Sequence, residues 1–210
     1  MNKTITALTV QKKNKERVSI FLDGEFAFGV SLSIAERLRK DQVLTSAEIE
    51  QLQSDEQYSK AYNAAVRYLS YRQRTQQEMT RYLTQKEYPD EVVTTTLERL
   101  LEYRYLDDEE FARSWLSDRT RLRPRSARAL RYELRQKGVA NDILDDVLQE
   151  LDEEEAAWNA VQSKLDRWRA LDEWPFQQKV SAFLGRRGFG YDVVRSVIER
   201  SKYHDDEIGS

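Results

Sequence analysis

The strongest concentration of charge in the sequence lies between Asp118 and Lys137. Eight basic residues accompany two acidic ones there, which gives this basic stretch a net charge of +6. The basic residues are Arg119, Arg121, Arg123, Arg125, Arg128, Arg131, Arg135 and Lys137. If the second half of the stretch is helical, Arg128, Arg131 and Arg135 fall within an arc of about 60° on one helix face. Such a row of guanidinium groups can follow a phosphate backbone or an acidic protein surface.

A solvated helix face is the competing interpretation of the basic stretch. Residues 139–157 carry eight acidic side chains and no basic one, so they can neutralise it. Against this, the positions equivalent to Arg128, Arg131 and Arg135 in an earlier copy of the helical pattern hold glutamine or threonine, so the architecture does not require arginine there. Both interpretations stay open. Secondary candidates for the same role are Arg72, Arg74, Arg81, Arg186 and Arg187.

The residue types used by the commonest enzyme mechanisms are scarce. The sequence has no cysteine and one histidine, His204 in a polar tail, which excludes disulfides, thiol catalysis, Cys/His zinc sites and histidine-based triads. The acidic runs 107–110 and 152–155 lack the pattern of a calcium loop and are typical of first-turn acids favoured by a helix dipole. The glycines at 185–190 follow no strand and precede no Lys-Ser or Lys-Thr pair. We therefore predict no cofactor and no bound metal.

The overall composition is that of a folded and heavily solvated protein. The chain has 210 residues, of which 40 % are hydrophobic and 34 % are charged. Its formal net charge is −3, so a site for nucleic acid has to be a local feature. No apolar run approaches the length of about 18 residues that spans a membrane, and no secretory core opens the chain. We expect a cytoplasmic protein without membrane contact.

From about residue 57 onward the apolar residues follow helical spacing, and the pattern repeats at a shift of 50 to 51 residues. Seven apolar columns recur, one of them formed by Leu83, Leu134 and Leu184, and only Thr96 departs from apolar character. Each copy is predicted to contain three helices. Aromatic residues at core spacing, which we expect to pack inside, are Phe111, Trp115, Trp158, Trp168 and Phe189.

Helix boundaries recur with the repeat. Second helices are predicted to begin near Thr75, Ser126 and Pro175. Third helices are predicted to begin after Asp90, Asn141 and Tyr191, with the first two as N-caps. Gly138 and Gly188 share a column that is typical of a helix ended by a left-handed glycine. Glu87 occupies this column in the first copy, so we expect that copy to end its helix differently.

Only the first thirty residues have the composition of β-strands. Residues 5–10, 17–22 and 25–30 are rich in β-branched and apolar types, and Asp23-Gly24 is a strong hairpin signal. These segments predict a three-stranded antiparallel meander. A helix suggested by the apolar residues within 32–38 is expected to cover it, because three strands alone are marginally stable.

Several ordered segments resemble the RecX family of recombination regulators. The segment 68–75 (YLSYRQRT) is similar to the family's opening segment, and 105–112 (YLDDEEFA) to its link into the second repeat. Similar endings of second helices occur at 134–139 (LRQKGV) and 186–189 (RRGF). The resemblance covers residue 57 to about 203. Gln73 departs from it, because a proline is common at that place.

The resemblance implies tandem three-helix repeats that bind the RecA recombinase filament on single-stranded DNA. Such proteins generally restrain ATP hydrolysis and strand exchange, so the resemblance implies a non-catalytic regulator whose partners are this filament and its single-stranded DNA. Duplex DNA is a further candidate ligand. We expect a monomer. The alternative is a sequence-tolerant DNA-binding protein built from three-helix units. A nucleic-acid enzyme has little support, because no spacing groups carboxylates into a two-metal site.

The predicted fold is mainly α, with tandem three-helix repeats that form a curved array after a small antiparallel β-meander. The expected divisions are 1–50 for the meander and a short helix, 57–106 for repeat 1, 107–155 for repeat 2 and 156–205 for repeat 3.

Overall fold

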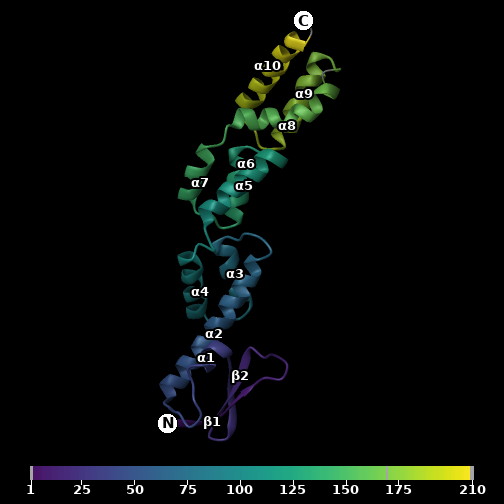
Figure 1. Cartoon of the computed structure of the whole chain (residues 1–210). Helices are drawn as coiled ribbons and strands as arrows, with labels where there is room; N and C mark the ends of the chain where they lie inside the picture. Colours follow the sequence, from purple (N-terminus) through teal and green to yellow (C-terminus); the bar gives the residue numbers. More distant parts are fainter. Residues whose placement is uncertain (1, 169, 209–210) are drawn as a thin grey trace. The chain divides into compact units, whose positions relative to one another are not determined.

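The computed structural model describes the backbone of residues 2–168 and 170–208, with side chains up to residue 202. The chain divides into two compact units. One unit is formed by residues 1–73 and 79–106, and the other by residues 74–78 and 107–210. The first unit contains the sheet, helices α1, α2 and α4, and α3 from residue 79 onward; the second contains the first three residues of α3 and helices α5 to α10 (Figure 1). As predicted, the fold is mainly helical and begins with an antiparallel sheet.

The N-terminal sheet has four strands in the order β3-β2-β1-β4, all antiparallel. They are β1 (Lys3–Val10), β2 (Arg17–Leu22), β3 (Glu25–Ser31) and β4 (Val43–Leu44). The β2–β3 turn has positive φ at Asp23 (51°) and Gly24 (92°), the backbone that suits a tight hairpin. The prediction of three strands was therefore incomplete. A two-residue strand such as β4 carries no alternating pattern, so tertiary pairing with Lys3 and Thr4 alone defines it.

Two helices follow the sheet. Helix α1 (Leu32–Ala35) is short, and its Ile34 and Ala35 pack with Leu38 on the buried face of the sheet. Helix α2 (Ser46–Leu69) begins at Ser46 rather than near residue 57, and it runs without a break through residues 50–57. Thr45 and Glu48 form a capping box at its start, and the hydrogen bonds from Thr45 lower the pKa of the Glu48 carboxyl.

A buried carboxylate attaches α2 to the sheet. Glu56 is almost fully buried and accepts hydrogen bonds from Arg17 Nη1 at 2.5 Å and from Ser31 N at 2.7 Å. Lys60 lies 3.3 Å from the same carboxylate. Because a buried carboxylate needs such partners, this cluster fixes the middle of α2 against β2 and β3.

The remaining helices form three sets with a shared plan. The first set combines α2 with α3 (Gln76–Gln85) and α4 (Asp90–Glu102). The second set is α5 (Asp108–Leu122), α6 (Ala127–Gln136) and α7 (Asn141–Gln149). The third is α8 (Glu153–Trp168), α9 (Glu173–Gly185) and α10 (Tyr191–Ile208). Each set has its own cluster of buried apolar side chains. Leu83, Leu134 and Leu184 are fully buried, as predicted for one column of the repeat.

Helix starts agree with the predictions in part. Thr75 and Ser126 accept hydrogen bonds from Glu78 N and Ala129 N, both at 3.2 Å, and so cap α3 and α6. Pro175 is the third residue of α9 rather than the first. Asp90 and Asn141 are the first helical residues, not N-caps, and no side chain caps α4 or α7. These turns are exposed, where water can satisfy the first amides.

All three second helices end in the same way. Gly138 and Gly188 have φ of 88° and 90°, and Glu87 has φ of 61°. The residue that follows each of these positions donates its backbone N–H to the carbonyl of the buried leucine in the same repeat. For example, Val139 N donates to Leu134 O at 3.1 Å. The expectation that Glu87 ends its helix differently was therefore wrong. Tertiary packing of the next residue holds Glu87 in a conformation that glycine adopts more easily.

Replacing Glu87 by Gly should raise the free energy of unfolding by about 1 kcal/mol, because the left-handed backbone disfavours a residue with a Cβ by roughly that amount. Urea denaturation measures the change. The control is Gln85→Gly in the last helical position of α3, which should lower stability. A destabilising Glu87→Gly would show that this turn is not left-handed in solution.

Thr96 is the polar exception within an apolar column. It is fully buried, and its hydroxyl has no hydrogen-bond partner among the described residues. The equivalent positions in the other repeats, Val147 and Val197, are buried and apolar. The Thr96 hydroxyl therefore loses its hydration on folding without replacement.

Replacing Thr96 by Val should raise the free energy of unfolding by about 1 to 2 kcal/mol, since it removes an unsatisfied hydroxyl and keeps the shape. The reverse change at the equivalent site, Val147→Thr, should lower stability. Chemical denaturation of both variants gives the comparison. Equal losses in both variants would show that the Thr96 hydroxyl is satisfied.

Candidate nucleic-acid interface

The basic stretch runs from the end of α5 through a short connection into α6. Arg119 and Arg121 lie in the last turns of α5, Arg123 and Arg125 in the connection, and three further arginines on α6. The capping Ser126 starts α6 directly after Arg125, so the sequence places seven arginines on two successive helices and their corner. Lys137 follows the end of α6.

Glu133 on α6 gathers part of this charge. It accepts hydrogen bonds from Arg119 Nε at 2.8 Å and from Trp115 Nε1 at 3.0 Å, and Arg125 Nη1 lies 3.1 Å from its other oxygen. The Arg119 guanidinium also lies 4.4 Å from the centre of the Trp115 ring. The side chain of Glu133 is only 17 % exposed, so this cluster is weakly screened. Arg119 and Arg125 therefore hold the α5–α6 corner together.

Three other cations of the stretch also have acidic partners. Arg131 Nη1 lies 2.6 Å from Asp145 on α7. This pair is expected if the acidic residues of 139–157 neutralise part of the basic stretch. Lys137 Nζ lies 3.3 Å from Glu78 and 4.5 Å from the centre of the Trp115 ring. Arg121 forms a looser pair with Asp118 at 3.5 Å.

Three arginines of the stretch remain exposed and unpaired. Arg123, Arg128 and Arg135 form no ion pair and no side-chain hydrogen bond within residues 2–168 and 170–202. The predicted row of Arg128, Arg131 and Arg135 thus contains one paired and two unpaired members. Because unpaired guanidinium groups keep all five donors available, these three are the best candidates for contact with an anionic partner.

Two secondary candidates join the basic stretch at the start of α6. Ser126 N donates to Arg187 O at 3.2 Å, which brings the α9–α10 turn beside the α5–α6 corner. Burial lowers the pKa of Arg187, and the neighbouring charges of Arg125 and Arg186 lower it further. Arg187 also lies 3.9 Å from the centre of the Phe183 ring. Arg125, Arg186 and Arg187 are therefore a cluster of like charge.

The secondary candidates of the first repeat are Arg72, Arg74 and Arg81. Arg72 Nη1 donates to the adjacent carbonyl of Gln73 at 2.8 Å. Arg81 is exposed on α3, and Arg74 is half-buried just before it. Arg72 and Arg81 belong to the first unit and Arg74 to the second.

The acidic runs cap helices, as their first-turn positions indicated. Asp107 and Asp152 accept backbone N–H bonds at the starts of α5 and α8. Asp108 is buried and accepts from Gln76 N at 2.8 Å; burial raises the pKa of its carboxyl, and that hydrogen bond opposes the rise. Glu153 accepts from Ala127 N in the same way.

No group of three or more metal-binding side chains occurs among the described residues, and the side chain of His204 lies outside them.

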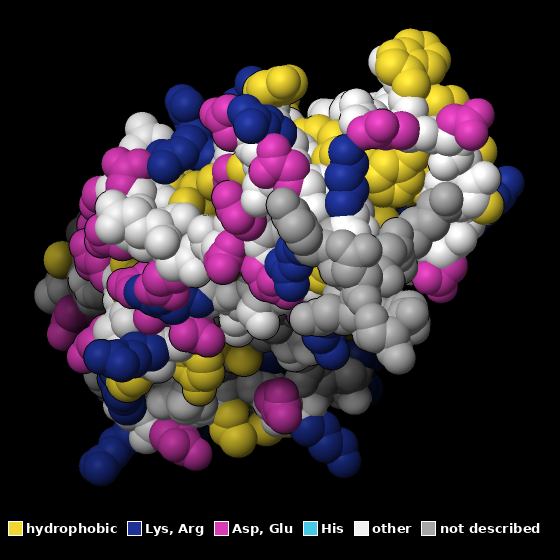
Figure 2. Space-filling model, turned by 90° about the horizontal axis from the view of Figure 1, so that it is seen from above, with side chains coloured by type: hydrophobic (Ala, Val, Ile, Leu, Met, Phe, Trp, Pro, Cys, Tyr) yellow, Lys and Arg dark blue, Asp and Glu magenta, His cyan; other side chains and the backbone are white. Residues whose placement is uncertain are grey.

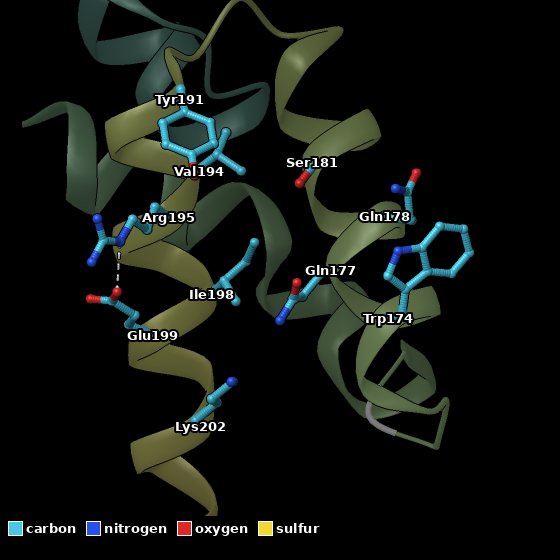
Figure 3. Close-up of a pocket in the computed structure, with 10 residues that line it drawn as sticks. All are labelled: Trp174, Gln177, Gln178, Ser181, Tyr191, Val194, Arg195, Ile198, Glu199 and Lys202. Carbon is cyan, nitrogen blue, oxygen red and sulfur yellow. Dashed lines mark hydrogen bonds and ion pairs between the residues drawn. The ribbon is translucent and has the colours of Figure 1, made fainter.

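The predicted core aromatics pack inside or at the edge of the core. Phe111, Trp158 and Phe189 are buried, whereas Trp115 and Trp168 are partly buried beside their clusters. Two aromatic residues that were not among the predicted site residues are exposed: Trp174 to 70 % and Tyr191 to 79 %. Figure 3 shows these two rings on α9 and α10, the helices that border a groove of about 330 Å³. The equivalent position is glutamine in the first copy and proline in the second, so the repeat does not require a buried aromatic residue there; this difference could have identified Trp174 as exposed.

The surface charge is mixed in at least one view. On the face drawn in Figure 2, basic and acidic side chains are interspersed, and hydrophobic side chains protrude between them. Local unpaired cations, rather than the total charge, therefore distinguish the candidate interface. No helix of the described residues is long and apolar enough to cross a lipid bilayer.

The fold defines a protein of helical repeats, with exposed arginines at the α5–α6 corner and on α6. Four domain families match the chain: "Regulatory protein RecX N-terminal domain" over residues 3–45, and the first, second and third three-helix domains of RecX over 61–100, 107–148 and 152–198. The chain belongs to the RecX family of regulatory proteins.

Individual relatives agree with this assignment. "Regulatory protein RecX" of Bacillus velezensis is 33 % identical and aligns over 97 % of this chain and 79 % of that protein. The protein of the same name from Clostridium botulinum (strain Alaska E43) is 31 % identical over 94 % of this chain and 95 % of its own. A crystal structure of regulatory protein RecX matches with a TM-score of 0.74 and 29 % identity, over 94 % of this chain and 99 % of that one. RecX from Lactobacillus salivarius shares the fold, with a TM-score of 0.64 and 23 % identity over 70 % of this chain and 97 % of that one.

Proposed function

We propose that this protein binds the RecA recombinase filament on single-stranded DNA and restrains its ATP hydrolysis and strand exchange. Membership of the RecX family over nearly the whole chain carries the proposal. The protein acts as a monomer in the cytoplasm and without catalysis, metal or cofactor. We also propose that the three repeats comprise residues 57–106, 107–155 and 156–205.

The contact surface in this proposal is the unpaired part of the basic stretch. Arg123, Arg128 and Arg135 are exposed and have no acidic partner among the described residues. They can neutralise phosphates of the filament's DNA or carboxylates of its protein. Contacts from several repeats add up, because each later contact forms at a high effective concentration. Occupancy of the filament by such a chain hinders subunit motion and excludes a second DNA strand.

The alternative function is sequence-tolerant DNA binding without recombinase. The cluster of Arg125, Arg186 and Arg187 favours it, because Arg186 and Arg187 have no acidic partner among the described residues and repel each other. Like charges held together are stabilised by a polyanion. Binding to DNA alone would then fall steeply with salt.

Co-sedimentation with a RecA filament on single-stranded DNA separates the two functions, with the same DNA alone as the control. The proposal predicts sedimentation of the protein with the filament at a salt concentration where naked DNA does not retain it. Equal retention by naked DNA would favour the alternative. Retention by neither would contradict both.

A further inference from the structure

The third repeat contains a second groove, and Trp174, which Figure 3 shows on α9, lines this groove as well as the first. Its volume is about 660 Å³, and it lies where the end of α8 meets α9. Arg167 and Trp168 line it from α8, and Trp174 and Lys179 line it from α9. Arg186, directly after α9, completes its basic lining. The groove thus combines basic and aromatic side chains from α8, from α9 and from the residue after α9.

The charge of this groove has one sign. Arg167, Lys179 and Arg186 are exposed, and none of the described lining residues is acidic. These three cations form no ion pair or side-chain hydrogen bond within the described part of the chain. Cations on the neighbouring α10 are paired, as Arg195 is with Glu199 at 2.9 Å. An anionic ligand is therefore the complement of this groove and not of the α10 face.

The aromatic lining of the groove restricts the kind of anionic ligand that fits it. Trp174 is 70 % exposed, although a tryptophan buries a large apolar area when it has a partner. Trp168 is held in place by an edge contact with Phe183, whose ring centre lies 5.2 Å away. A flat apolar ring beside unpaired cations suits a ligand with alternating phosphates and exposed bases. Duplex DNA offers phosphates but keeps its bases stacked, and an acidic peptide offers no base.

The positive charge continues beyond the groove. Arg186 is followed by Arg187, whose pKa falls through burial and through the charges of Arg125 and Arg186. The hydrogen bond from Ser126 N to Arg187 O joins this turn to the start of α6. A ligand that uses the whole path is therefore a chain of several phosphates rather than a mononucleotide.

We propose that the α8–α9 groove binds single-stranded nucleic acid, with a base stacked on Trp174 and phosphates on Arg167, Lys179 and Arg186. The strand continues past Arg187 toward Arg125. This inference deepens the proposed function, on which it rests, by making the DNA strand a direct ligand of the third repeat.

Fluorescence anisotropy of labelled oligo(dT) with the protein alone tests the groove at low salt. Trp174→Ala should weaken binding by about 5- to 150-fold, the usual range for one stacked base. Changing Arg167, Lys179 and Arg186 together to Gln should weaken it further and reduce the log–log salt slope by about 2, at roughly 0.7 for each phosphate that is no longer neutralised. Trp174→Phe should retain part of the affinity and reduce the quenching of tryptophan emission by the oligonucleotide to what Trp168, which also lines the groove, contributes.

Two matched variants come from the neighbouring groove. Tyr191→Ala removes an equally exposed ring, and Arg195→Gln removes an exposed cation, both from α10. Neither should change oligo(dT) affinity by more than about twofold, because neither side chain lines the α8–α9 groove and loss of an exposed ion pair has little effect on the fold. Because all substituted side chains are largely exposed, thermal melting should be unchanged in every variant.

Several results would overturn the inference. These are absence of oligo(dT) binding, unchanged binding by Trp174→Ala, equal affinity for duplex DNA, and equal competition by polyglutamate. None of these measurements uses RecA, so a negative result for binding in the groove leaves the proposed function standing. Conversely, oligo(dT) binding with no effect on the filament would keep the groove and reject the proposed function.

Discussion

Replacing Leu134 by Ala should lower the free energy of unfolding by about 2 to 5 kcal/mol, the cost of a large cavity in a well-packed core. Leu134 is fully buried within the cluster formed by α5, α6 and α7. It also accepts, through its carbonyl, the hydrogen bond that ends α6. The alanine variant keeps this backbone bond, so the loss reports side-chain packing. Guanidinium or urea denaturation measures it.

The matched control is Leu122→Ala, because Leu122 ends α5 in the same repeat but is 67 % exposed. Its replacement should change stability by less than about 0.5 kcal/mol, as for most surface positions. A loss below about 1 kcal/mol for Leu134→Ala would contradict the burial of this column and with it the repeat register.

Changing Arg123, Arg128 and Arg135 together to Gln should weaken binding to the RecA filament by about tenfold for each arginine that bonds to the partner, since hydrogen bonds to charged groups contribute roughly 1.5 to 3 kcal/mol. Glutamine keeps a polar side chain with good helix propensity, and no ion pair is broken among the described residues. Arg125 and Arg131 are left unchanged, because they pair with Glu133 and Asp145. Quantitative co-sedimentation gives the affinity.

A control variant with the same loss of positive charge replaces Arg99, Arg113 and Arg195 by Gln. Each of these arginines is ion-paired with a nearby glutamate. It should bind the filament normally, apart from a small effect of net charge. Undiminished binding by the Arg123, Arg128 and Arg135 variant, with normal thermal stability, would show that the basic stretch is a solvated face. If phosphates are the partners, its salt slope should also fall, by about 0.7 for each phosphate of a single strand that these arginines neutralise.

Much of the fold follows from local pattern. The hairpin at Asp23-Gly24 and the buried columns of the repeats are fixed by turn chemistry and by helical spacing. Features that depend on tertiary context were missed. Strand β4 is defined by pairing with β1, and the polar first half of α2 is helical because Ile49 and Leu52 pack on the sheet core. Similarly, packing holds Glu87 in a left-handed conformation.

The candidate site was predictable in position but not in detail. The charge count located the basic stretch, yet it could not separate paired from unpaired arginines. Their partners are distant in sequence: Glu133 lies 14 residues from Arg119, and Glu78 lies 59 residues from Lys137. The link between Arg187 and Ser126 likewise needs the packing of two repeats. The groove at Trp174 was missed because its lining residues, all within 167–186, come together only through the packing of α9 against the end of α8.

The rate of single-strand-dependent ATP hydrolysis by RecA is the most direct test of the proposed function. With this protein at concentrations below that of the recombinase, the rate should fall, while the protein alone should hydrolyse no ATP. The Arg123, Arg128 and Arg135 variant should need a higher concentration for the same effect. An unchanged rate under conditions where co-sedimentation shows the protein on the filament would contradict the account.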